Sequence, residues 1–330
     1  MDVFLSTTGS GIGRAVWAKN GNWSVEFLLT GQAVSCLAAD PLKAGVVYAG
    51  TRANGVLRSS DHGQTWSSSG LAGHNVKSIS ASRVERGTLV AGTKPAMLFV
   101  SRDGGENWAE LGSFRHIASR RFWFSPAEAP FSAYVQGIAL SPSQPDVIVA
   151  GIEVGAVVRS TDGGKTWTDH RPGALRDCHS ITFHAANGDR IYEAGGSGAG
   201  VAISRDAGDT WTQPKAGLDR HYGWACAADP EQPDIAYVST SPDPFKAHSG
   251  NNAQAHIFRS IDGGAWQKLE GGLPQPLNSM PYALLTNPAE PGHLYAGLSN
   301  GDVWHSADHG DTWRQLPFNL KNIERMLIML

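Results

Sequence analysis

The amino-acid sequence predicts an all-β protein, a seven-bladed β-propeller whose ring is closed by its own C-terminal strand. An eight-residue pattern occurs six times, once in a copy shortened by the loss of its Thr, and one apolar segment, residues 323–330, follows the last copy without a repeat of its own. The 39 glycines and 18 prolines are spread along the 330 residues, as in proteins rich in β-turns. Repeats of fixed period indicate solenoids or propellers. We therefore expect a single domain, residues 1–330.

The repeated pattern reads Ser-x-Asp-x-Gly-x-Thr-Trp, and its first copy occupies residues 59–66. Its aspartates are Asp61, Asp103, Asp162, Asp206, Asp262 and Asp308. They lie 42, 59, 44, 56 and 46 positions apart, and a blade of four strands takes about 40–50 residues. Asp accepts backbone N–H groups in a tight turn, Gly adopts conformations that other residues avoid, and Trp packs on the hairpin. These aspartates are therefore predicted to be structural.

This pattern resembles the Asp box of the sialidase-like, or BNR, repeat family, and the resemblance covers essentially the whole chain. True sialidases of that family are six-bladed and carry an Arg-Ile-Pro-like motif that this sequence lacks, so we exclude a classical sialidase. Asp-box xyloglucanases pair two propellers, and photosystem II assembly factors carry a targeting segment and an arginine patch. The chain is most similar to bacterial "glycosyl hydrolase-like" BNR-repeat proteins. That resemblance implies the fold and leaves the activity open.

The six copies do not account for the whole chain. Residues 2–27 contain two strand patterns and a degraded copy at 20–23, but no inner strand. The apolar tail supplies a strand that has no blade. We expect residues 322–330 to complete blade 1 with residues 2–27, and blades 2–7 to occupy about 33–317. Closure of this kind removes exposed sheet edges.

Composition argues against several classes of partner. The net charge of −3 gives no field for nucleic acid or acidic lipid. No apolar run approaches the roughly 18 residues that a membrane helix needs, and the N-terminus shows no signal-peptide pattern. The three cysteines fall in apolar strand segments and are expected to be buried free thiols. These features favour a cytoplasmic protein with no nucleic-acid or membrane partner.

Aligning the blades places one residue of each inner strand at an equivalent position beside the axis. This position, the axial slot, holds polar or aromatic residues: Ser35, Lys77, Gln136, His179, Trp224, Tyr282 and, as the seventh, Glu324. The loops that precede the inner strands share one face with those between second and third strands, and ligands of propellers bind there. A pocket at this mouth is one hypothesis, and ordinary polarity of strand ends is the alternative.

Candidate site residues follow from this mouth and from two long insertions, residues 114–124 and 241–252. The catalytic candidates are His179, Asp177, His221 and Glu153. The ligand-binding candidates are Arg220, Tyr222, Trp224, Gln136, Trp123, Arg176, Tyr282, Lys77 and His248. Histidines that converge on an axis can bind metal or transfer protons. For a divalent metal the candidate ligands are His116, His179 and His221, with hydrogen-bonded or surface histidines as the alternative. The sequence specifies no cofactor.

Two classes of function remain open at this point. The first is a pocket for a small-molecule or sugar-like ligand, with hydrolase or lyase chemistry carried by histidine and acidic residues. Glycoside hydrolysis requires two facing carboxylates about 5–9 Å apart. The second is a scaffold that binds partner proteins over its faces, which an apolar exposed rim would favour.

Overall fold

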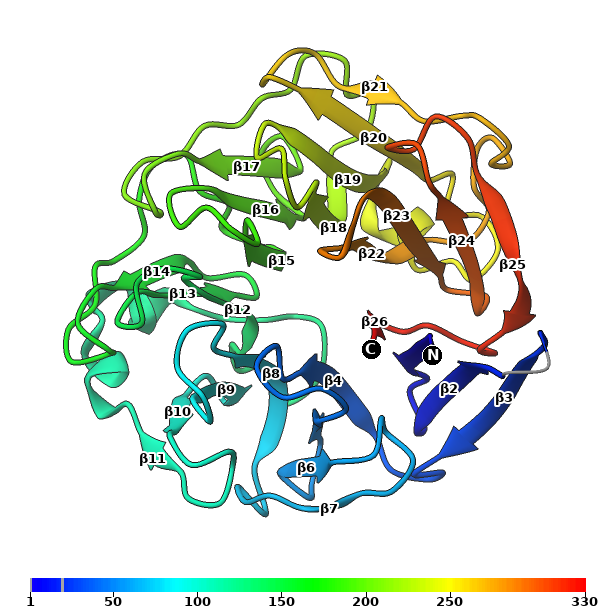
Figure 1. Ribbon diagram of the computed structural model, residues 1–330. Helices are drawn as coiled ribbons and strands as arrows, with labels where there is room; N and C mark the ends of the chain where they lie inside the picture. Colours follow the sequence, from blue (N-terminus) through cyan, green and yellow to red (C-terminus); the bar gives the residue numbers. More distant parts are fainter. Residues whose placement is uncertain (1, 19–20) are drawn as a thin grey trace.

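The computed structural model describes residues 2–18 and 21–330. Within these residues the strands form seven antiparallel sheets, and Figure 1 shows the sheets arranged as a ring around one axis. The predicted all-β, seven-bladed propeller is confirmed. No helix in the described ranges is long and apolar enough to cross a membrane.

Each blade is built from strands that follow one another outward from the axis. Blade 2 contains β4 (Val34–Ala39), β5 (Val47–Thr51), β6 (Val56–Ser59) and β7 (Ser67–Ser68). Blade 3 contains β8 (Asn75–Ala81), β9 (Leu89–Lys94), β10 (Leu98–Ser101) and β11 (Ala109–Glu110). Blade 4 contains β12 (Val135–Leu140), β13 (Ile148–Ile152) and β14 (Val157–Ser160), and blade 5 contains β15 (Cys178–Phe183), β16 (Ile191–Gly195) and β17 (Val201–Ser204). In blades 4 and 5 a single bridge takes the place of the fourth strand.

The last two complete blades repeat the four-stranded form. Blade 6 contains β18 (Tyr222–Ala228), β19 (Ile235–Ser241), β20 (His256–Ile261) and β21 (Gln267–Lys268). Blade 7 contains β22 (Pro281–Asn287), β23 (Glu290–Leu298), β24 (Asp302–Ser306) and β25 (Arg314–Asn319).

Blade 1 joins the two ends of the chain. It contains β1 (Val3–Thr7), β2 (Ile12–Trp17), β3 (Trp23–Leu28) and, as its inner strand, β26 (Leu327–Met329). Strand β26 pairs with β1 through Phe4↔Met329, Leu5↔Ile328 and Ser6↔Leu327, and both termini lie near the centre of the ring in Figure 1. The C-terminal strand therefore closes the ring, as predicted. Of the degraded copy at 20–23, Asn20 lies outside the described residues.

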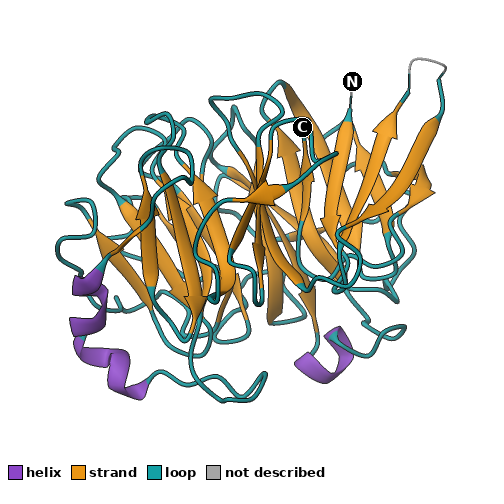
Figure 2. Ribbon diagram, turned by 90° about the horizontal axis from the view of Figure 1, so that it is seen from below, coloured by secondary structure: helices purple, strands orange, loops and turns teal. Residues whose placement is uncertain are grey.

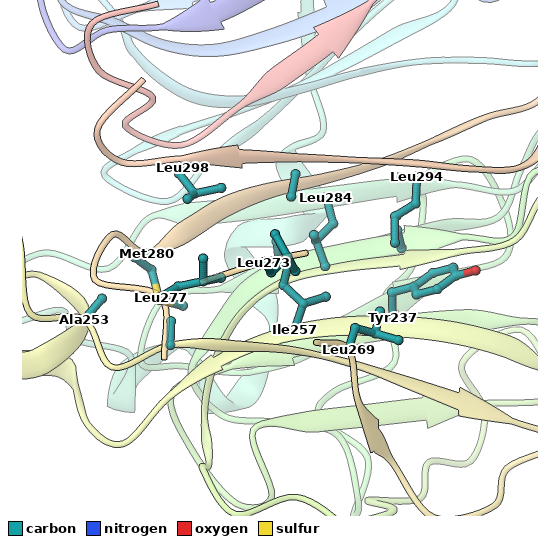
Figure 3. Close-up of a cluster of buried hydrophobic side chains, with 14 of the residues drawn as sticks. Tyr237, Ala253, Ile257, Leu269, Leu273, Leu277, Met280, Leu284, Leu294 and Leu298 are labelled. Atoms are coloured by element: carbon teal, nitrogen blue, oxygen red, sulfur yellow. The ribbon is translucent and has the colours of Figure 1, made fainter. Parts of the chain in front are cut away.

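The apolar core lies between neighbouring blades. Between blades 6 and 7, Tyr237 and Ile257 of one blade pack with Leu284 and Leu294 of the next (Figure 3). Each sheet thus buries its faces against the sheets beside it, so a blade gains most of its stability from its neighbours. The cysteines Cys36, Cys178 and Cys226 are buried and unpaired within these cores.

The Asp boxes are closed hydrogen-bonded turns. In the copy of blade 4, Asp162 accepts hydrogen bonds from the backbone N–H of Thr166 (2.9 Å), the Thr166 hydroxyl (2.6 Å) and the Ser160 hydroxyl (2.8 Å). The bonds from Thr166 hold the pKa of Asp162 at about 2. Four other copies, centred on Asp61, Asp103, Asp206 and Asp308, repeat the network. The copy in blade 6 differs, since no described residue hydrogen-bonds the carboxylate of Asp262 and Ser260 donates to Gly264 instead.

This difference supplies a matched test of the structural role of the boxes. We expect Asp162→Ala to lower the melting temperature, because Thr166 and Ser160 lose their acceptor. Asp262→Asn removes the charge of a carboxylate that makes no such bonds, and Asn tolerates the positive φ of 55° at this position, so the melting temperature should stay unchanged. Differential scanning calorimetry measures both. A loss of ligand binding in folded Asp162→Ala protein at unchanged stability would contradict the structural interpretation.

Two insertions carry the helices of the molecule. Between β11 and β12 lie the 3₁₀-helices η1 (Gly112–His116) and η2 (Ala118–Phe122), and between β19 and β20 lies α1 (Pro244–Ala247). Asp243 caps α1 by accepting a hydrogen bond from the Lys246 backbone N–H (2.9 Å). Figure 2 shows that both insertions extend toward the same face of the ring. The Asp boxes, at the turns between third and fourth strands, belong to the opposite face.

Candidate functional site: the axial cavity

The axial slot is built from β-bulges. In each of the inner strands β4, β8, β12, β15, β18 and β22, the pairing register with the second strand shifts at the slot. At Lys77, for example, the ladder passes from Val76↔Thr93 directly to Ser78↔Gly92. A bulged residue stands outside the ladder and its side chain is re-aimed. The slot residues of these strands all line the axial channel: Ser35, Lys77, Gln136, His179, Trp224 and Tyr282.

The seventh slot position is occupied by Arg325, whereas the sequence analysis expected Glu324. Arg325 lines the channel together with the other six slot residues. The Glu324 backbone N–H donates to the Thr7 carbonyl (2.9 Å), and its side chain lines only the outer cavity. The alignment of the blades was therefore one residue out of register in the tail, and it placed an acid where the structure has a cation.

Above the slot the channel widens into a cavity of about 1020 Å³ on the face that carries the helices. A narrower space of about 160 Å³ continues along the axis at the level of the slot residues. Loops that precede inner strands and loops that follow second strands form the walls, including those that carry Tyr134, Asp177, Arg52 and Glu153. The walls divide by chemistry into an acidic, an aromatic and a cationic side.

The acidic side consists of Glu153, Asp177 and His179. One side-chain ligand atom from each lies within 4.8 Å of the other two. The Nδ1–H of His179 donates to the Gly223 carbonyl (2.7 Å), which turns Nε2 toward Asp177 Oδ2 at 3.6 Å. Asp177 Oδ1 accepts a hydrogen bond from the backbone N–H of Val154 (3.3 Å). Two carboxyl groups and an imidazole nitrogen therefore face one another at the base of the cavity.

Burial decides the protonation of this group. Burial and the neighbouring Asp177 raise the pKa of Glu153 to about 8, against the opposing effect of Arg325. Burial lowers the pKa of His179, although Asp177 opposes the shift. At neutral pH Glu153 is therefore a protonated group that can donate its proton, and it lies beside Asp177 and a neutral His179.

The aromatic side surrounds His248. Its two ring nitrogens are hydrogen-bonded to the hydroxyls of Tyr222 (2.9 Å) and Tyr282 (2.6 Å). Burial lowers the pKa of His248, so the ring is neutral and links the two tyrosines. The Trp224 ring lies 4.8 Å from that of Tyr282 and 4.4 Å from that of His179. These rings form a continuous surface of the kind on which a sugar ring stacks.

The cationic side was largely missed by the sequence analysis. Arg52, Lys77 and Arg325 line the cavity there, and the buried Lys94 joins them around the Tyr134 ring and the carboxylate of Glu128. Of these residues only Lys77 was a candidate, because it occupies a slot. The others come from second-strand ends, the tail and an insertion. Their one sequence signal was basic or acidic character in loops of the mouth face.

The structure brings most predicted residues together and leaves five elsewhere. Those in the cavity or channel are Glu153, Asp177, His179, Tyr222, Trp224, Gln136, Tyr282, Lys77 and His248. Those that line neither space are His221, Arg220, Arg176, Trp123 and His116.

Chain alternation explains two of these corrections. Tyr222 and Asp177 face the cavity, so their neighbours His221 and Arg176 point the other way. Arg220 forms an ion pair with Asp219 instead (2.7 Å). The indole N–H of Trp123 donates to Ser119 (3.0 Å) while its ring packs on Phe114. This indole therefore seals the insertion against blade 4.

The predicted histidine metal site is corrected in the same way. His116 is exposed at the end of η1 and His221 is exposed before β18, and neither lines the channel with His179. Within the described ranges, Glu153, Asp177 and His179 are the group of three whose spacing would admit a metal ion. Their oxygen and nitrogen donors suit a divalent cation.

Comparison with known proteins places the chain among repeat propellers. The BNR/Asp-box repeat model matches residues 158–169, which contain the box of blade 4. A xyloglucanase from Paenibacillus sp. is 27% identical over 203 residues, which cover 59% of this chain and 15% of that enzyme. The chain thus corresponds to a small part of the length of this relative.

Solved structures show the same architecture. The GH74 enzyme of Niastella koreensis superimposes with a TM-score of 0.71 at 20% identity, covering 95% of this chain and 52% of that one. The GH74 xyloglucanase of Xanthomonas campestris gives 0.71 at 17% identity, with coverages of 97% and 52%. YCF48 bound to D1 peptide gives 0.55 at 16% identity, with coverages of 86% and 80%. Six repeated boxes, seven blades and these similarities agree in supporting a β-propeller built from BNR, or Asp-box, repeats.

Proposed function

We propose that the axial cavity binds a glycan and that the chain is a glycoside hydrolase acting through Glu153 and Asp177. The observation that carries this proposal is the facing pair of carboxyl groups, with oxygens within 4.8 Å, of which one is protonated at neutral pH. Retaining glycosidases place their carboxyl groups about 5–5.5 Å apart. The similarity to a xyloglucanase and to GH74 enzymes supports a glycan as the ligand.

Each residue then has a defined part in the reaction. Glu153 donates its proton to the oxygen of the leaving sugar, and the Asp177 carboxylate attacks the anomeric carbon from the other side. Glu153, now ionised, takes a proton from the water that releases the sugar from Asp177. His179, fixed by its bond to Gly223, orients Asp177. The rings of Trp224 and Tyr282 provide the stacking surface.

The proposal is tested by incubating the protein with a panel of plant and microbial oligosaccharides and following new reducing ends. We expect cleavage of at least one glycan and its loss in Asp177→Asn. Asp219→Asn, which removes an exposed acid outside the cavity, should cleave like the wild type. Addition of a chelator should leave turnover unchanged, whereas full loss would assign Glu153, Asp177 and His179 to a metal and overturn the acid–nucleophile mechanism.

A second candidate function is the docking of a partner protein on the same face. It is favoured by four exposed phenylalanines of the insertions, Phe122, Phe124, Phe131 and Phe245. Phe245, 87% exposed, also lines the cavity. Phe245→Ser discriminates the two functions. It should weaken oligosaccharide binding if the mouth is a glycan site, and binding unaffected by this change would favour docking of a protein.

A further inference from the structure

The cationic side of the cavity presents more positive charge than the structure neutralises. Three cations, Arg52, Lys77 and Lys94, share the single carboxylate of Glu128, and a fourth, Arg325, lies beside them at the Tyr134 hydroxyl. The Lys77 and Lys94 side chains are only 6% and 4% exposed. A buried ammonium group is stable only when it is paired and hydrogen-bonded. Lys77 and Lys94 therefore both require an anion within hydrogen-bonding distance.

Glu128 is the anion that occupies this place. Its Oε1 lies 2.7 Å from Lys77 Nζ and 3.3 Å from Lys94 Nζ, and its Oε2 lies 3.3 Å from Arg52 Nη2. Although partial burial raises the pKa of Glu128, Lys77 and Lys94 lower it to about 2. The cations therefore bind a planar carboxylate from three directions.

The segment that carries Glu128 is an insertion and no part of a blade. Glu128 lies between η2 and β12, in a stretch of turns and irregular chain from 123 to 134. The Lys94 ammonium also donates to the Glu128 backbone carbonyl (2.7 Å). Side chains of the ring thus supply the cations, whereas a loop supplies the anion. A loop can withdraw a side chain without disturbing the sheets.

The cationic side is continuous with the carboxyl pair. Arg325 Nη2 lies 3.4 Å from the Tyr134 hydroxyl, and its charge lowers the pKa of Glu153. The Tyr134 ring carries Lys77 on one side at 4.7 Å from its centre. A ring-shaped ligand held by its anionic group at Glu128's place would therefore extend toward Glu153 and Asp177.

We propose that Arg52, Lys77, Lys94 and Arg325 form a subsite for the carboxylate of a uronic acid, and that Glu128 occupies this subsite until the ligand displaces it. The proposal deepens the proposed function by naming the substrate class, and it rests on the cavity being a glycan site. A carboxylate is favoured over other anions because three of the four cations already bind one, that of Glu128. Recognition by several charge-assisted hydrogen bonds discriminates acid from neutral sugars.

The test compares acid and neutral sugars of the same ring geometry by isothermal titration calorimetry. The probes are trigalacturonic acid with its methyl ester, and cellotriouronic acid with cellotriose. We expect the wild type to bind one of the acids at least ~10-fold more tightly than its neutral partner, as expected for lost charge-assisted bonds. Glu128→Gln should bind that acid more tightly still, and Lys77→Met should abolish the preference.

Glu110→Gln is the matched control, because Glu110 pairs with Arg115 outside the cavity at a similar exposure, 30% against 27% for Glu128. Its acid affinity should equal that of the wild type. If Glu128→Gln does not fold, Glu128→Asp, which keeps the charge on a shorter stem, should give an intermediate gain.

Equal affinities for acid and neutral sugars, no binding of either acid, or no gain in the Glu128 variants would overturn the subsite. Tighter binding of a sulfated trisaccharide would overturn the assignment to a carboxylate. Because calorimetry measures binding alone, an acid that binds without being cleaved refutes the hydrolase while supporting the subsite. Cleavage of neutral glycans by a protein that binds acid and neutral sugars equally well supports the hydrolase and refutes the subsite.

Discussion

Glu153→Gln is expected to lower the rate of glycan hydrolysis by a factor of ~10²–10⁴, the usual contribution of a general acid. The amide keeps the shape of the side chain but has no proton to donate at pH 7. Activity of the wild type should fall as the pH rises through about 8, because Glu153 then loses its proton. The residual activity of the variant should lack this alkaline limb. The measurement is kcat/KM against pH for both proteins.

The same substitution should stabilise the fold at alkaline pH. The folded-state pKa of Glu153, about 8, lies above the ordinary value of 4.5. Its contribution to stability is therefore fully present below pH 4.5 and is lost as the pH rises through 8. Glu153→Gln removes this loss, so its melting temperature should exceed that of the wild type at pH 9.

Glu193 provides a control for this pair of effects. It is a fully buried acid whose pKa is also raised by burial, and it accepts a hydrogen bond from the Leu175 backbone N–H (2.9 Å) away from the cavity. Glu193→Gln should change stability and leave turnover intact. If Glu153→Gln hydrolysed the glycan as fast as the wild type, Glu153 would not be the acid.

Removal of residues 322–330 is expected to convert the protein into an aggregating species. Strand β1 would lose its partner β26 and present an open edge beside the channel. The deletion also removes Ile323 and Leu327, which are 0% and 1% exposed in the core between blades 7 and 1. Size-exclusion chromatography and calorimetry measure the outcome. A truncated chain that stayed monomeric with an unchanged melting temperature would refute closure by the tail.

Point substitutions separate the loss of packing from the loss of the strand. Leu327→Ala should lower the free energy of unfolding by ~2–5 kcal/mol, the range for a buried leucine. Ile328→Ala, on the partly exposed side of β26, should lower it less. Negligible effects of both substitutions would mean that β26 contributes through its backbone alone.

The fold could be predicted because its signals are local. Each Asp box makes its hydrogen bonds within a few residues, as Asp162 does with Thr166 four positions away. A pattern of this length is legible in the sequence, and its count and spacing then determine the number of blades. The seventh blade could be predicted because the first repeat lacks an inner strand and the tail contains an apolar strand without a repeat. In the structure this strand, β26, pairs with β1.

The site could be predicted only where the repeat itself positions a residue. His179 and Lys77 occupy equivalent slots, so alignment of the blades found them. Glu128 meets Arg52 across 76 positions, and Arg325 meets Tyr134 across 191. Such contacts depend on how an insertion folds over the mouth and on the register of the tail. The repeat pattern contains no information on the fold of the insertion or on the register of the tail. The alignment of the tail was wrong by one residue, so Glu324 was predicted in the slot that Arg325 occupies.

At the bulges, the side chains that line the axial channel do not take part in the strand pairing that holds the blades together. A slot side chain stands at a point where the inner strand has no ladder partner, as Lys77 does between Val76 and Ser78. An exchange of that side chain leaves the inter-strand hydrogen bonds on either side in place. Six of the seven slots are built in this way, so their side chains can change without any change in the pairing of their blades. A propeller of this kind can acquire a new specificity by single exchanges at its centre while its repeats stay as they are.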